Sequence, residues 1–92
     1  MFKFGIFVDI KPYKFMGKKI KLIWDFKGPD GLATAKHHCI HLKEFALIDN
    51  LAYDEVNFQE LHPMHAIAFI NIDESVMKIF RDALKPHRGE LV

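Results

Sequence analysis

Histidine is the residue type in this chain whose grouping could support chemistry. Five of the six histidines fall into two short clusters, His37, His38 and His41 in the first and His62 and His65 in the second. Imidazole titrates near neutral pH and is the commonest protein ligand for transition metals. Any metal or proton chemistry in this protein is therefore expected to involve these clusters.

The first cluster has the spacing of a metal site on a helix. His37 and His41 are four residues apart and Glu44 follows three residues later, so a helix brings all three to one side. Two imidazoles and a carboxylate in this arrangement could hold Zn²⁺ or another divalent metal. The predicted ligands are His37, His41 and Glu44, with His62 or His65 as a fourth. The alternative is that these residues are polar side chains on a solvated helix face.

The same cluster does not match a metalloprotease. In a zincin, a glutamate that acts as general base follows the first histidine of the motif. Here His38 occupies that position. The chain also lacks a phosphate-binding glycine pattern, and its only serine and only threonine, Ser75 and Thr34, have no base nearby in sequence. A nucleotide site of the common glycine-rich kinds and a hydroxyl nucleophile are therefore not predicted.

Three further residues are candidates for binding a small ligand. Asp25 lies between Trp24 and Phe26, where burial by aromatic rings could raise the pKa of its carboxyl group and suit it to acid–base work. Strand alternation offers the alternative that Asp25 simply faces outward. Arg88 follows a helix end, where it could bind a carboxylate or phosphate with two hydrogen bonds or complement the helix dipole. The predicted ligand-binding residues are Asp25, Arg88 and His38.

Periodic apolar residues predict the elements that carry these side chains. Apolar and polar residues alternate in two early segments, which indicates strands, and recur at helical spacing in two later ones. Asp30 and Asp73 are the expected N-caps of the two helices. The predicted strands are 2–10, 18–26, 54–61 and 65–72, the helices are 32–48 and 73–85, and 89–92 could add a short edge strand.

This order predicts an α+β fold of the ferredoxin-like plait type with an extra N-terminal strand. Without the first strand, the order is β-α-β-β-α, followed by the optional last strand. The strand 65–72 is apolar on both faces and should be central, with both helices on one face of an antiparallel sheet. The chain forms one domain, 1–92, in which 1–15 is a candidate extension of a shorter core. The alternative of two β-β-α halves has no support from residue similarity.

Composition limits the partners. Half of the 92 residues are apolar and nine are Phe, more than two short helices can cover, so we expect a homodimer. The net charge is +1 and Arg occurs only at 81 and 88, so no nucleic-acid partner is expected. No segment is long and apolar enough to predict a membrane span. The single Cys39 excludes an intramolecular disulfide, is expected in the core, and fits a cytoplasmic protein.

Three functions remain open on these observations. The first is a small binding or interaction module that holds a ligand, or a divalent metal such as zinc, through histidines. The second is a cofactor-independent enzyme that uses Asp25 and a histidine as acid and base on a small molecule. The third is a structural or regulatory dimer domain in which the histidines are incidental.

Overall fold

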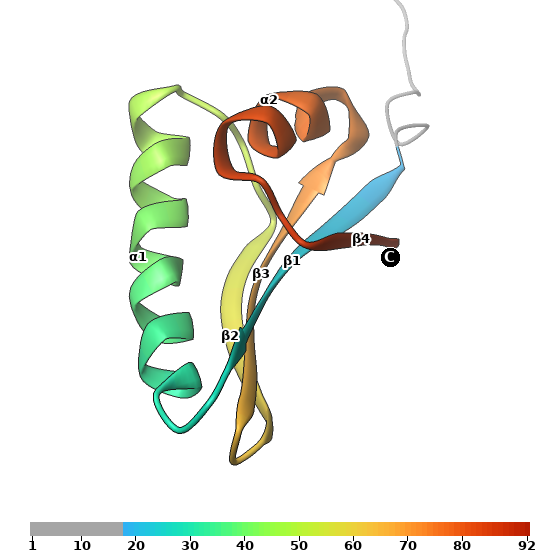
Figure 1. The fold of residues 1–92 in the computed structure, drawn as a ribbon. Coiled ribbons are helices and arrows are strands. Elements are labelled where there is room, and N and C mark those ends of the chain that lie inside the picture. Colours follow the sequence, from blue (N-terminus) through green and yellow to red (C-terminus); the bar gives the residue numbers. More distant parts are fainter. Residues whose placement is uncertain (1–17) are drawn as a thin grey trace, which may run out of the picture.

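The computed structural model of the chain describes residues 18–92, which form a four-stranded antiparallel sheet with two helices (Figure 1). The predicted strand 2–10 and the candidate extension 1–15 lie outside the described residues. The elements are β1 (Lys19–Lys27), α1 (Gly31–Ile48), β2 (Glu55–His62), β3 (His65–Asp73), α2 (Glu74–Leu84) and β4 (Arg88–Leu91). Each agrees with a predicted element to within two residues, and the optional last strand is present as β4.

The strands lie in the order β2-β3-β1-β4, and every neighbouring pair is antiparallel. The strand that is apolar on both faces, β3, is internal, as predicted. Trp24 of β1 lies opposite Ala68 of β3, and Ile23 lies opposite Arg88 of β4. This arrangement of an antiparallel sheet and two helices is consistent with a ferredoxin-like type of fold.

Both helices pack on the same face of the sheet, because alternate residues of β1 and β3 supply one continuous apolar surface. The main core joins residues of both strands and both helices. Its buried members are Leu22, Trp24, Leu42, Ala46, Ile70, Ile72 and Phe80. Ile23, Ile67 and Phe69 alternate with these strand residues and form a separate buried cluster on the opposite face of the sheet.

The first half of α1 lies close to the sheet because small residues meet there. Ala35 and Cys39 pack against Ala66 and Ala68 of β3. A Cβ atom on Gly31 would lie only 2.6 Å from the carbonyl oxygen of Phe26, so this contact requires glycine. Burial raises the pKa of the Cys39 thiol, in agreement with its predicted place in the core.

Both predicted N-cap residues lie at the starts of their helices, but only one of them caps its helix with its side chain. The Asp73 side chain accepts a hydrogen bond from the Ser75 amide at 2.9 Å, as an N-cap should. Asp30 occupies the N-cap position of α1, but its side chain makes no capping bond, and its carbonyl oxygen accepts from the Thr34 hydroxyl instead. Lys85, in the left-handed conformation, ends α2 before Pro86. Neither helix of residues 18–92 combines the length and apolarity that crossing a bilayer requires.

Candidate functional site

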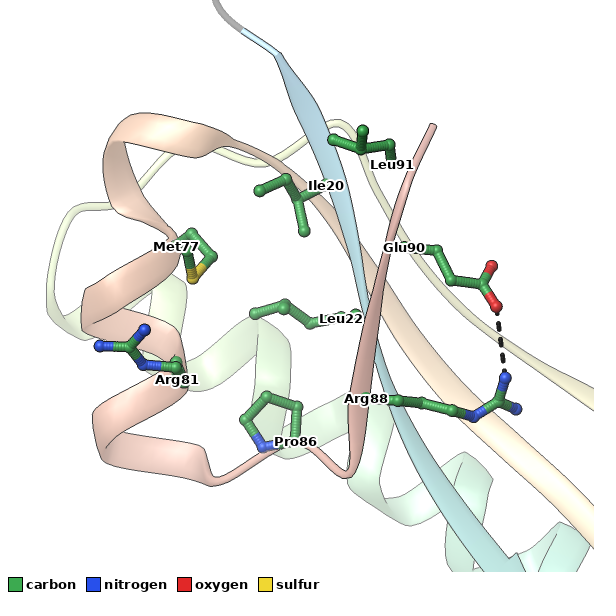
Figure 2. Close-up of a pocket in the computed structure, with 9 residues that line it drawn as sticks. Ile20, Leu22, Met77, Arg81, Pro86, Arg88, Glu90 and Leu91 are labelled. Atoms are coloured by element: carbon green, nitrogen blue, oxygen red, sulfur yellow. Dashed lines mark hydrogen bonds and ion pairs between the residues drawn. The ribbon is translucent and has the colours of Figure 1, made fainter.

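A hollow of about 360 Å³ lies between α2, the first half of β1 and β4. Figure 2 shows the side chains of Ile20, Leu22, Met77 and Pro86 pointing into this space. Alternation places the two β1 residues on the helix face, and helical spacing brings Met77 over them. The walls are therefore mainly apolar, and the volume lies in the range of about 300–1,000 Å³ that is typical of small-molecule sites.

Gly89 keeps the hollow open on the side of β4. It pairs with Leu22, and a Cβ atom at this position would lie 3.4 Å from Leu22 Cδ2 and 3.8 Å from Ile20 Cγ2. A larger side chain would therefore occupy the space that the hollow now provides. Leu91, the next residue of β4 on this face, is 71% exposed and forms the rim.

Arg81 supplies the charge on the helix side of the hollow. Arg88 and Glu90 also border it, but Figure 2 shows their side chains on the other side of β4, where they contact each other at 3.3 Å. Arg81 Nε donates to Asp82 Oδ1 at 3.2 Å, whereas its terminal nitrogens have no partner within 18–92. The rim of an apolar space thus carries a cationic side chain that can reach solvent.

The sequence did not single out Met77 or Pro86 as site residues. Met77 lies within the predicted helix 73–85, and Pro86 directly follows it. The one available signal was Gly89, a glycine at the start of the optional last strand. A cavity next to it could not be inferred without the pairing of β4 with β1.

Asp25 and Arg88, two of the predicted ligand-binding residues, come together on the opposite face of the sheet. Arg88 Nε donates to Asp25 Oδ2 at 3.0 Å and Nη2 donates to Oδ1 at 3.1 Å, which is a two-pronged ion pair. His65 Nε2 lies 2.8 Å from Asp25 Oδ1. Arg88 thus binds a carboxylate, as predicted for a ligand, but this carboxylate is the side chain of Asp25.

Of the two interpretations of Asp25, the one with a raised pKa is wrong. Trp24 and Phe26 point to the helix face, so they do not surround the carboxyl group. The hydrogen bonds from Arg88 lower the pKa of Asp25 to about 2, against the opposing effect of burial and with a further lowering contribution from His65. Asp25 is therefore ionised at neutral pH and has no proton to give as an acid.

His87 belongs to the same cluster and was not among the predicted site residues. Its Nδ1 accepts a hydrogen bond from the Asp25 backbone amide at 2.8 Å, and its own amide donates to the Ile23 carbonyl oxygen at 2.9 Å. These contacts place the residues just before β4 against β1. The signal in the sequence was the cationic loop 85–89, but only the register shows which strand it meets.

His38 lies apart from Asp25 and Arg88, on the helix side of the sheet. Its ring is half-buried against Trp24 and Phe26, with centroid distances of 4.8 and 5.4 Å. Burial lowers the pKa of His38, with smaller contributions from His41, His87 and His37. Its buried Nε2 has no hydrogen-bond partner within the described residues. The three predicted ligand-binding residues therefore do not form one site.

The predicted metal ligands are brought together only in part. The Nε2 atoms of His37 and His41 lie 2.9 Å apart, and His41 Nδ1 lies 3.3 Å from Glu44 Oε1, all on an exposed face of α1. His62 accepts a hydrogen bond from the Met64 amide in the β2–β3 turn. His65 points to the opposite face of the sheet, so the prediction that it joins the helix residues is wrong. Within 18–92, no group of three or more His, Cys, Asp or Glu side chains is placed to hold a metal ion.

Comparison of the chain with models of protein families, with characterised proteins and with solved structures found no match to any of them.

Proposed function

We propose that this protein is a small-molecule binding module and that the hollow between α2 and β4 is its ligand site. The supporting observation is an apolar space of about 360 Å³ with a single charged side chain, Arg81, on its helix side. The order of elements and strands also supports our proposal that the fold is the full ferredoxin-like plait.

The ligand class follows from the walls and the rim. Apolar side chains from β1 and α2 favour an aliphatic or aromatic body, since burial of such a group removes apolar surface from water. Arg81 favours a carboxylate or a similar anion at the end that stays near solvent. The proposed ligand is therefore a small amphipathic acid.

Octanoate and octanol provide a direct test, because they share an apolar chain and differ in charge. We expect calorimetry on the full chain to detect octanoate more strongly than octanol. Arg81→Gln should remove that preference and leave octanol binding unchanged. Equal binding of the two compounds to the unmodified protein would contradict the role of Arg81.

Two neighbouring positions on α2 test the location of the site. Met77→Trp should fill the hollow and weaken octanoate binding by about tenfold or more, which corresponds to about 1.4 kcal/mol. Lys78→Trp places the same side chain at an exposed position outside the hollow and should leave binding unchanged. If both variants bind octanoate like the unmodified protein, the ligand does not occupy this hollow.

A further inference from the structure

The outer edge of β2 has the properties of an interface with another strand. β2 is an edge strand of the described sheet, and it is eight residues long, whereas the other edge strand, β4, has four residues. It contains neither Pro nor Lys, the residues that commonly protect an edge from pairing. A bulge interrupts its pairing with β3 only between Glu60 and His62, so the backbone is regular before that point.

Exposed apolar side chains lie beside this edge. Lys36, Ile40, Lys43 and Leu47 recur at spacings of four and three residues and form one flank of α1. The Lys36 ammonium lies 5.4 Å from the centre of the Phe58 ring, which places this flank on the side of β2. Ile40, Leu47 and Phe58 are 54%, 81% and 38% exposed. Helix and strand thus present three exposed apolar side chains, which alternate with Lys36 and Lys43 on the helix flank.

We propose that this surface, which we call the β2 edge, joins two copies of the chain into a homodimer by antiparallel β2–β2 pairing. A two-fold axis through Phe58 would pair Phe58 with its counterpart and Val56 with Glu60 of the other copy. Across this axis even-numbered residues pair with even-numbered residues, so side chains that face α1 in one copy pair with side chains that face α1 in the other. The two sheets would therefore continue into one sheet with all four helices on the same face.

The spacing of the helices leaves room for side chains between them. α1 packs on β3, with β2 on one side of it and β1 on the other. Strands are about 4.8 Å apart in a sheet, so two α1 helices related by this axis would lie about 14 Å apart. That is wider than the range of about 8–10 Å for directly packed helices. Ile40 and Leu47 of both copies would then face each other across this gap. The proposed contact accounts for the most exposed apolar residues on the side of α1 that faces β2.

Charge complementarity identifies a second copy, rather than an unrelated protein, as the partner. The strand carries Glu60 and the helix flank carries Lys43, and neither has an ion-pair partner within 18–92. Val56 pairs with Ile70 of β3, and Ile70 lies in the same core cluster as Leu42, the residue before Lys43. Pairing Glu60 of one copy with Val56 of the other therefore brings the carboxylate towards the partner's Lys43. By symmetry this contact occurs twice.

Light scattering of the full chain over a range of concentrations tests the proposal. We expect twice the chain mass at tens of micromolar. Phe58→Lys should give the monomer, because it places two like charges on the symmetry axis beside Lys36. Lys78→Glu, a change on α2 away from the edge, should leave the dimer intact. A monomer at every concentration, or a dimer that Phe58→Lys does not weaken, would overturn the proposal.

A charge-reversal cycle distinguishes this interface from any other dimer and does not depend on Phe58. Lys43→Glu and Glu60→Lys should each raise the dimer dissociation constant by about tenfold or more. The double variant should recover most of the original dissociation constant, because the opposite charges meet again with exchanged signs. Circular dichroism of each variant tests whether the monomer is folded. Additive losses in the double variant would rule out the Lys43–Glu60 contact and with it this pairing.

Discussion

At the scale of single residues, Asp25 explains how β4 is held against the sheet. Its carboxylate accepts two hydrogen bonds from Arg88, and its backbone amide donates to His87. His87 lies in the junction between α2 and β4, and Arg88 is the first residue of β4. An ion pair this close, with a carboxylate only 19% exposed, stabilises the fold only while Asp25 is ionised.

Asp25→Asn should lower the free energy of unfolding at neutral pH by about 1–2 kcal/mol, after allowance for the partly exposed Arg88. Because the folded pKa of Asp25, about 2, is lower than its ordinary value of 3.8, the stabilisation is present above about pH 4 and is lost as the pH falls to 2. Urea unfolding at several pH values measures this. The control is Asp82→Asn, which removes an exposed pair. An equal loss at pH 2 and pH 7 would contradict this explanation.

His38 gives a second pH dependence, in a different range. Burial lowers the pKa of His38 from 6.5, so the unfolded chain takes up a proton at this residue more readily than the folded one. Stability should therefore fall as the pH drops below about 6.5, and His38→Leu should remove part of that slope. Urea unfolding between pH 7.5 and pH 5 tests this. The same slope in both proteins would count against it, and His62→Gln, at the exposed end of β2, serves as control because His62 does not contribute to the pKa of His38.

At the scale of elements, the start of α1 depends on one close contact. Glycine usually weakens a helix, and replacing it with alanine usually stabilises the protein. At Gly31 the sign should reverse, because the added Cβ would overlap the Phe26 carbonyl oxygen at 2.6 Å. We expect Gly31→Ala to cost about 1–3 kcal/mol. Thermal unfolding measures this cost. Ala33→Gly is the control, because it changes helix propensity at an exposed position without a close contact. A Gly31→Ala variant that is more stable than the unmodified protein would refute the role of the contact.

The elements themselves could be predicted from local pattern. β1 and β3 follow the alternation of apolar residues, and α1 follows the spacing of Ala35, Cys39, Leu42 and Ala46, all of which are buried. These patterns depend only on residues that are close in sequence, and the apolar residues of each pattern are the ones that the core buries. Asp30 lies at the N-cap position of α1 as predicted, but its side chain makes no capping hydrogen bond, a detail of side-chain geometry that the residue type alone does not determine.

The candidate sites could be predicted only in part because their residues meet across the sheet. Asp25 and Arg88 are far apart in sequence, and only the register that sets Ile23 opposite Arg88 brings them together. His65 illustrates the same limit, since a shift of one residue in strand register would have turned it towards α1. The hollow beneath α2 stays open mainly because Gly89 has no side chain to fill it. A pattern of residues along the chain does not predict such a cavity.

At the scale of the whole molecule, β4 connects the two faces of the sheet. On one face Arg88 binds Asp25, and on the other Gly89 and Leu91 border the proposed ligand site (Figure 2). β4 has only four residues and pairs with β1 alone among the described strands. The position of one wall of the hollow therefore depends on an ion pair that lies outside it.

Arg88→Gln should loosen this wall without changing any side chain that points into the hollow. We expect faster hydrogen exchange at the backbone amides of β4, because the strand then opens more often. Octanoate binding should weaken severalfold, since the ligand must bear the cost of ordering β4. Glu90→Gln, which removes only the exposed second partner of Arg88 at 3.3 Å, is the matched control and should change neither quantity appreciably. Faster exchange in Arg88→Gln with unchanged octanoate affinity would show that the ligand site does not depend on the position of β4.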